Sequence, residues 1–85
     1  MADAIPAIRR RVLRHVERTG GCTRDEAELA LGLSHQTCSP RFTELHYRGH
    51  IRDSGRVQPT RSGRNAVVWV ITAAGLAELR EEEAA

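Results

Sequence analysis

Residues 34–49, SHQTCSPRFTELHYRG, contain several side chains that can donate or accept hydrogen bonds. Their spacing would place them together on one side of a helix. The apolar residues of this stretch recur at the interval of a helical turn: Cys38, Phe42 and Leu45. They predict a helix with an apolar inner face. On its outer face lie the amide of Gln36 and the guanidinium of Arg41, two groups that can form paired hydrogen bonds with a partner. An ordinary solvated helix face is the alternative interpretation.

Pro40 complicates the start of this helix, because proline lacks the backbone N–H that an interior helical residue donates. If Thr37 caps the helix, Pro40 is its third residue, where the missing N–H is harmless. If Ser34 is the cap, the helix must begin loosely or kink on its exposed side. We expect a loose turn from Ser34 and a regular helix from Thr37, closed by Gly49.

A second group of polar residues surrounds a glycine-containing turn; its members are Arg56, Arg61, Arg64 and Asn65. The flanking residues change to the period of two that is typical of strands. Residues 50–60 predict a strand interrupted at Ser54-Gly55, with Pro59 on an edge. Residues 66–72, AVVWVIT, predict a better strand with Val67, Trp69 and Ile71 on one face. The arginines either contact an anionic partner or protect the exposed strand edge from aggregation.

Helices are expected on both sides of these two segments. The first runs from Asp3 or Ala4 to Thr19, with Asp3 as cap and a core stripe of Ile5, Ile8, Val12 and Val16. The second begins with a capping box, Thr23 to Glu26, and ends at Gly32. A last helix follows Thr72. Leu13 lies off the main stripe, and it could pack with Leu76 and Leu79 within one chain or across a homodimer.

Charge is concentrated in the middle of the chain. The whole sequence has a net charge of +2, but residues 41–64 carry six Arg against two acidic residues. Such a basic segment is typical of an anion-binding face. All 13 basic residues are Arg, which suits phosphate and guanine but also follows from a GC-rich coding sequence.

Several classes of function are not indicated. No apolar run is long enough to span a bilayer, and the start lacks the apolar core of a signal peptide. Two cysteines are too few for a secreted disulfide framework, so we expect a cytoplasmic protein. His46 and His50 are four residues apart, but Gly49 between them spoils the geometry of a metal pair. No catalytic motif is present. We therefore expect no enzymatic activity, no metal site and no cofactor.

Three stretches together resemble the winged helix-turn-helix superfamily, of the small bacterial or phage-encoded type and loosely MarR-like. They are TRDEAELALGL (23–33), TCSPRFTELHYRGHI (37–51) and VVWVIT (67–72) with the Ala-Ala-Gly that follows. The resemblance implies one α+β domain over residues 1–85: a three-helix core, a recognition helix at about 35–49, a β-hairpin wing at about 50–72 and a short C-terminal helix at about 73–83.

The resemblance also implies contacts to double-stranded DNA. The recognition helix would lie in the major groove, where Gln36 suits a paired contact to adenine and Arg41 one to guanine. The wing would contact phosphates or the minor groove. The residues expected at DNA are Gln36, Thr37, Ser39, Arg41, Arg48, Arg56, Arg61, Arg64 and Asn65. Glu44 would repel phosphate unless it accepts from cytosine or pairs with Arg41 or Arg48. We expect a small transcriptional regulator or a phage recombination or replication accessory factor. The alternative is a module that docks on another protein.

Overall fold

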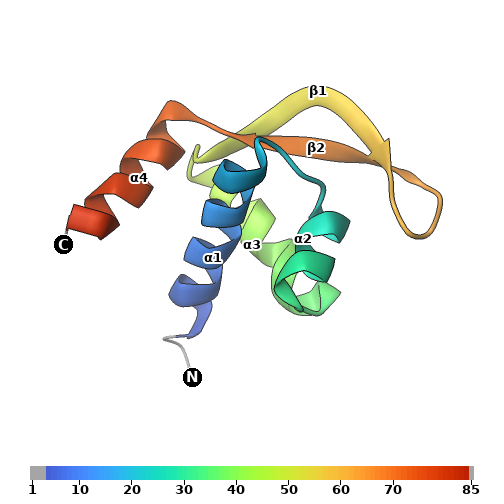
Figure 1. Ribbon diagram of the computed structural model, residues 1–85, viewed down its shortest axis with the longest axis horizontal. Helices are drawn as coiled ribbons and strands as arrows, with labels where there is room; N and C mark the ends of the chain where they lie inside the picture. The colour runs from blue at the N-terminus through green and yellow to red at the C-terminus, as the bar shows by residue number, and fades with distance from the viewer. Residues whose placement is uncertain (1–3, 85) are drawn as a thin grey trace.

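The structure is a computed structural model that describes residues 4–84, apart from the side chains at 82 and 84. Within this range lie four helices and a two-stranded antiparallel sheet (Figure 1). Their bounds are α1 Ala4–Thr19, α2 Arg24–Leu31, α3 His35–Tyr47, β1 Ile51–Pro59, β2 Asn65–Ile71 and α4 Ala73–Ala84. The expected α+β class is confirmed, and the element order is compatible with a winged helix. None of the described helices combines the length and the apolar character needed to cross a membrane.

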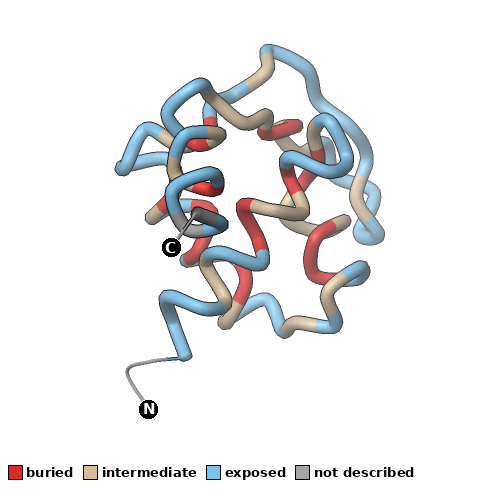
Figure 2. Tube along the Cα trace, turned by 60° about the vertical axis from the view of Figure 1, so that its left-hand side comes forward, coloured by how far each residue is buried: buried red, intermediate tan, exposed pale blue. Residues whose placement is uncertain are grey.

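The hydrophobic core lies between the helices and the sheet, and Figure 2 shows the buried stretches turned toward the middle of the molecule. Its members are Val12, Leu13, Val16, Cys22, Ala27, Cys38, Phe42, Leu45, Ile51, Trp69 and Leu79. The predicted inner face of α3 is therefore confirmed. Ile5, at the start of the predicted stripe, is instead 39% exposed. Leu13 is buried together with Leu79 in this core, so these two residues pack within one chain.

The caps of α2 and α3 set the tight turn between these helices. Thr23 and Glu26 form the predicted capping box, and Gly32 ends α2 in the left-handed conformation, with φ of 66°. Ser34, not Thr37, caps α3: its Oγ accepts from the Thr37 backbone N–H at 3.2 Å. The prediction of a regular helix only from Thr37 is wrong. The N-terminal cap proposed at Asp3 for α1 lies outside the described residues.

Pro40 consequently lies in the interior of α3, five residues after its first residue. Both Pro40 and Gln36, four residues before it, are exposed, so water can bond the carbonyl that lacks its helical donor. At the other end, Gly49 has φ of 76°, its N–H bonds the His46 carbonyl, and the His50 N–H bonds the Leu45 carbonyl. This is a Schellman motif, and it confirms Gly49 as the terminating residue.

The hairpin contains the predicted interruption. The register between β1 and β2 shifts between Asp53 and Val57, so the residues around Ser54-Gly55 form a bulge. The second edge of β2 is not free over its whole length, because Cys22 exchanges two backbone hydrogen bonds with Trp69, of 3.0 and 2.8 Å. This short third pairing was not predicted from the sequence. It fastens the α1–α2 connection to the sheet.

The start of α4 is fixed against the end of α3. Thr72 caps α4 through its Oγ, which accepts from the Gly75 N–H at 3.1 Å and donates to the Gly49 carbonyl at 2.6 Å. A Cβ at Gly75 would collide with the backbone carbonyl of His50 and with the Ile71 side chain. Glycine is therefore required there by close approach.

Candidate nucleic-acid interface

The outer face of α3 is only partly what the sequence predicted. Gln36, Pro40 and Thr43 are exposed, and Tyr47 at the end of the helix has 87% of its surface exposed. Thr37 is half-buried, and its Oγ1 lies 3.0 Å from the Ser34 Oγ that donates to it. Gln36 is thus the predicted contact residue that projects most freely from the first half of α3.

Arg41 does not lie on this face. It is 8% exposed and forms a bidentate pair with Glu44, from Nε to Oε1 at 2.9 Å and from Nη2 to Oε2 at 2.7 Å. The prediction that Arg41 points outward is wrong, because its fork is satisfied by a carboxylate one turn further along the helix. A guanine contact from Arg41 would require this pair to open.

Glu44 joins α3 to α1 as well. Its Oε1 also accepts from Arg9 Nε at 3.0 Å, so one carboxylate serves two guanidinium groups. Burial favours the neutral form of Glu44, but the hydrogen bonds from Arg41 and Arg9 outweigh it and lower the pKa of the carboxyl. Of the predicted alternatives for Glu44, pairing with Arg41 is confirmed. Its charge is therefore compensated locally.

Ser39 is half-buried and is held by α2. Arg24 Nη1 donates to the Ser39 carbonyl at 2.8 Å, to its Oγ at 2.7 Å and to Thr43 Oγ1 at 3.2 Å. The same guanidinium lies 5.6 Å from the ring centroids of both Phe42 and Trp69. Partial burial lowers the pKa of Arg24. Arg24 thus fastens the first turn of α2 to the middle of α3.

The hairpin is fastened to the other side of α2. Arg61 donates from Nε to Asp25 Oδ1 at 2.6 Å, from its backbone N–H to Oδ2 at 3.1 Å, and from Nη2 to Glu28 Oε1 at 3.3 Å. Gln58 adds a 2.7 Å hydrogen bond to Glu26. The hydrogen bond from Arg61 lowers the pKa of Asp25. Arg61 remains 55% exposed, but its charge is shared with two carboxylates.

The other predicted wing residues, Arg56, Arg64 and Asn65, are exposed, and so is Arg48 after the end of α3. Among the described residues, none of their side chains has a hydrogen bond or ion pair. Their guanidinium and amide groups are therefore available to an external partner. Of the other described arginines, only Arg18 on α1 and Arg80 on α4 also have a side chain without a hydrogen bond or ion pair.

The beginning of α3 and the hairpin turn lie close together. A hollow is lined by residues from the start of α2, from the start of α3 and from the turn: Arg24, Asp25, Glu28, His35, Thr60, Ser62 and Ala66. His35 is held there by a 2.8 Å contact from Nδ1 to Glu28. The two predicted contact segments are thus neighbours, with the acidic residues of α2 between them.

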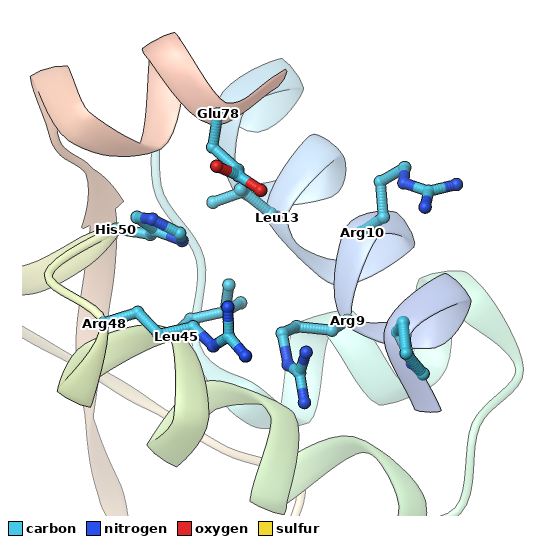
Figure 3. A pocket seen from close by; sticks show the side chains of 8 residues that line it. Arg9, Arg10, Leu13, Leu45, Arg48, His50 and Glu78 are labelled. Atoms are coloured by element: carbon cyan, nitrogen blue, oxygen red, sulfur yellow. The ribbon is translucent and has the colours of Figure 1, made fainter. Parts of the chain in front are cut away.

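Another hollow, of about 200 Å³, lies between α1, the end of α3 and α4 (Figure 3). Leu13 and Leu45 form its buried floor. Arg48 and Glu78 point into it from opposite elements, whereas Arg10 points away. Three arginines, Arg9, Arg10 and Arg48, belong to its lining, and the hairpin turn does not.

The described residues show no group of three or more His, Cys, Asp or Glu that could hold a metal ion. His46 instead lies against Trp69, with ring centroids 5.0 Å apart. Burial raises the pKa of the Cys22 and Cys38 thiols to about 11, which is typical of unreactive structural cysteines.

Sequence reasoning missed three residues that organise this surface: Arg24, Asp25 and Glu28. One signal was available, since residues 24–28 carry three acidic residues against one Arg and could have been matched with the basic hairpin. No pattern along the sequence indicates that Arg24 reaches over two aromatic rings. Neither a scan against protein-family models nor a search of curated proteins finds a match to this chain.

Proposed function

We propose that this chain is a winged helix protein that binds double-stranded DNA, with α3 in the major groove and the β1–β2 hairpin as a wing on the phosphates. One observation carries this proposal. The exposed outer face of α3, including Gln36, neighbours a hairpin whose Arg56 and Arg64 have no partner among the described residues. Small transcriptional regulators and recombination or replication accessory factors are the roles that fit such a protein.

The dimensions are compatible with this arrangement. The 13 residues of α3 span about 20 Å, and a B-DNA major groove about 12 Å wide admits one helix. Three available arginines, Arg48, Arg56 and Arg64, would each neutralise about one phosphate. A plot of the logarithm of the binding constant against the logarithm of the salt concentration should then have a slope of about −3.

The proposal is tested by fluorescence anisotropy with a labelled random-sequence duplex, at several salt concentrations. The double variant Arg56→Gln, Arg64→Gln removes two available wing charges. Its slope should be shallower than that of the wild type by about 2, at about 0.9 for each phosphate contact. Arg61 is left unchanged because its replacement would also release the hairpin from Asp25 and Glu28.

The matched control is Arg18→Gln, Arg80→Gln, which removes the same charge from α1 and α4. If binding is a diffuse attraction to any arginine, both double variants lose the same affinity and the proposed interface is wrong. An absence of salt-dependent binding by the folded wild type would refute DNA binding itself.

Docking on another protein is the second candidate, and exposed apolar side chains favour it. Tyr47 is 87% exposed and Val57 is 62% exposed. In this case, Tyr47→Ala should abolish capture of the partner, while Arg56→Gln, Arg64→Gln should leave it intact. The two candidates thus predict opposite effects of the two changes.

The state of the cysteines bears on the compartment. Cys22 and Cys38 are free and buried, without a disulfide between them. Such thiols persist in a reducing environment, so we propose that the protein acts in the cytoplasm.

A further inference from the structure

One stripe of α3 combines three unlike groups at helical spacing. Gln36, Pro40 and Glu44 lie four residues apart, so they follow one another along the same side of the helix. Together with His35, Ser39 and Thr43 they line an open hollow on the helix surface.

Pro40 changes the backbone as well as the surface. In an uninterrupted helix the residue at position 40 would donate its N–H to the Gln36 carbonyl, and proline has no N–H to donate. The Gln36 carbonyl therefore lacks its helical donor at a position where both residues are exposed. The exposed surface of the stripe at this point is the apolar Pro40 ring.

The polar side chains of the stripe accept hydrogen bonds more than they donate them. Glu44 is an ionised carboxylate held in place by Arg9 and Arg41, and it is about 30% exposed. Arg41 is the residue that would offer a donor fork to guanine, and it is turned inward onto Glu44. The Gln36 amide supplies both an acceptor and a donor, and its side chain has no partner among the described residues.

We propose that the Gln36–Pro40–Glu44 stripe reads bases that present an exocyclic amino group in the major groove, adenine N6 or cytosine N4, and discriminates against guanine. Guanine presents only acceptors at this edge, so the Gln36 NH₂ alone could match it and the Glu44 carboxylate would oppose it. Adenine matches the Gln36 amide, and the thymine methyl of the same base pair matches the Pro40 ring. This inference rests on the proposed DNA binding and names the bases that the same site would select.

The test is selection of bound duplexes from a library with a randomised core, followed by affinity measurements on single-base variants of the selected site. Adenine or cytosine should be enriched at two or more neighbouring positions of one strand. Replacement by guanine at each should weaken binding at least about fivefold, the lower end for one good paired contact. Random-sequence binding at low salt is measured in parallel.

Two variants separate the groups of the stripe. Pro40→Ala restores a backbone N–H to the Gln36 carbonyl and removes the ring; since alanine favours helix, this variant folds. It should relax the preference at one position to less than about twofold. Gln36→Glu retains acceptors and loses the amide donor that adenine N7 needs, so it should shift the preference from adenine to cytosine. Pro6→Ala, at the other exposed helix proline, should change nothing.

The outcomes distinguish the inference from the function on which it rests. Salt-dependent binding without base preference, or with guanine preferred, overturns the inference and leaves DNA binding in place. An unchanged preference in both Pro40→Ala and Gln36→Glu also overturns it. If the folded wild type binds no DNA even at low salt, the proposed function and the inference are both wrong.

Discussion

The two-arginine arrangement around Glu44 is the most informative contact to perturb. In Glu44→Gln the side chain keeps its shape but loses its charge. The amide oxygen can still accept, whereas the NH₂ group faces guanidinium donors and can accept nothing. Arg41, which is 8% exposed, is then left with at least one unsatisfied N–H and no compensating charge.

The expected loss follows from the three hydrogen bonds of 2.7, 2.9 and 3.0 Å. Bonds to a charged group contribute about 1.5–3 kcal/mol and neutral ones about 0.5–1.5 kcal/mol. Because Glu44 is partly exposed, we expect the free energy of unfolding to decrease by about 2 kcal/mol. For a chain of 85 residues this is a substantial part of a total of about 4–13 kcal/mol.

Urea unfolding followed by the fluorescence of Trp69, the single tryptophan, measures this change. With an m-value of about 1–2 kcal/mol/M, the midpoint should fall by about 1–2 M. Glu81→Gln, on the exposed surface of α4, is the control and should change the free energy by less than about 0.5 kcal/mol. If Glu44→Gln behaves like this control, Arg41 is not held by Glu44. In that case Arg41 would be free to face outward and contact guanine.

The pH dependence provides an independent check with a definite sign. The carboxyl of Glu44 has a pKa lowered in the folded state, because the hydrogen bonds from Arg41 and Arg9 outweigh the opposing effect of burial. Its contribution to stability is therefore complete above the unfolded pKa of about 4.3 and is lost as the pH falls through the folded pKa. The difference between wild type and Glu44→Gln should be constant at neutral pH and narrow below about pH 4.

Three further changes test other parts of the structure. Gly75→Ala should destabilise the protein by about 1 kcal/mol in urea unfolding, because the collision with the His50 carbonyl outweighs the gain in helix propensity; a stabilised variant would refute the close approach. Pro40→Ala should stabilise the protein by about 1–3 kcal/mol, measured by calorimetry, because the alanine N–H completes a helical hydrogen bond. An unchanged stability would mean that α3 is not regular at this position. Cys22 and Cys38 should not react with Ellman's reagent at about pH 8 until denaturant is added, because burial raises their pKa to about 11; rapid reaction of the folded protein would contradict their burial.

Much of the fold was predictable because its signals are local. The capping box at Thr23, the left-handed glycines and the change of period from helix to strand each depend on a few neighbouring residues. The cap of α3 was predicted at Thr37 because that position keeps Pro40 in the first turn. The Ser34 hydroxyl caps the helix instead, although Pro40 then lies in its interior. A proline with a solvated partner carbonyl costs a helix less than one whose partner is buried.

The candidate site was less predictable, because it depends on which charges meet in space. Arg41 and Glu44 are three residues apart, a spacing at which a helix can pair them, but the third member of the cluster, Arg9, comes from α1. Arg61 and Asp25 are 36 residues apart, and no local pattern joins them. The same holds for Arg24, which crosses from α2 to α3.

These pairings change what the basic middle of the chain implies. The six arginines of residues 41–64 suggest a strongly cationic face, yet Arg41 and Arg61 are satisfied by carboxylates within the protein. Non-specific attraction to phosphate then comes from a few exposed side chains and should be modest and easily screened by salt. A DNA-binding protein with so weak an electrostatic contribution must obtain its useful affinity from contacts to base edges. If the chain binds DNA as proposed, the composition of the exposed face of α3, more than the net charge of the chain, should therefore decide which DNA it binds.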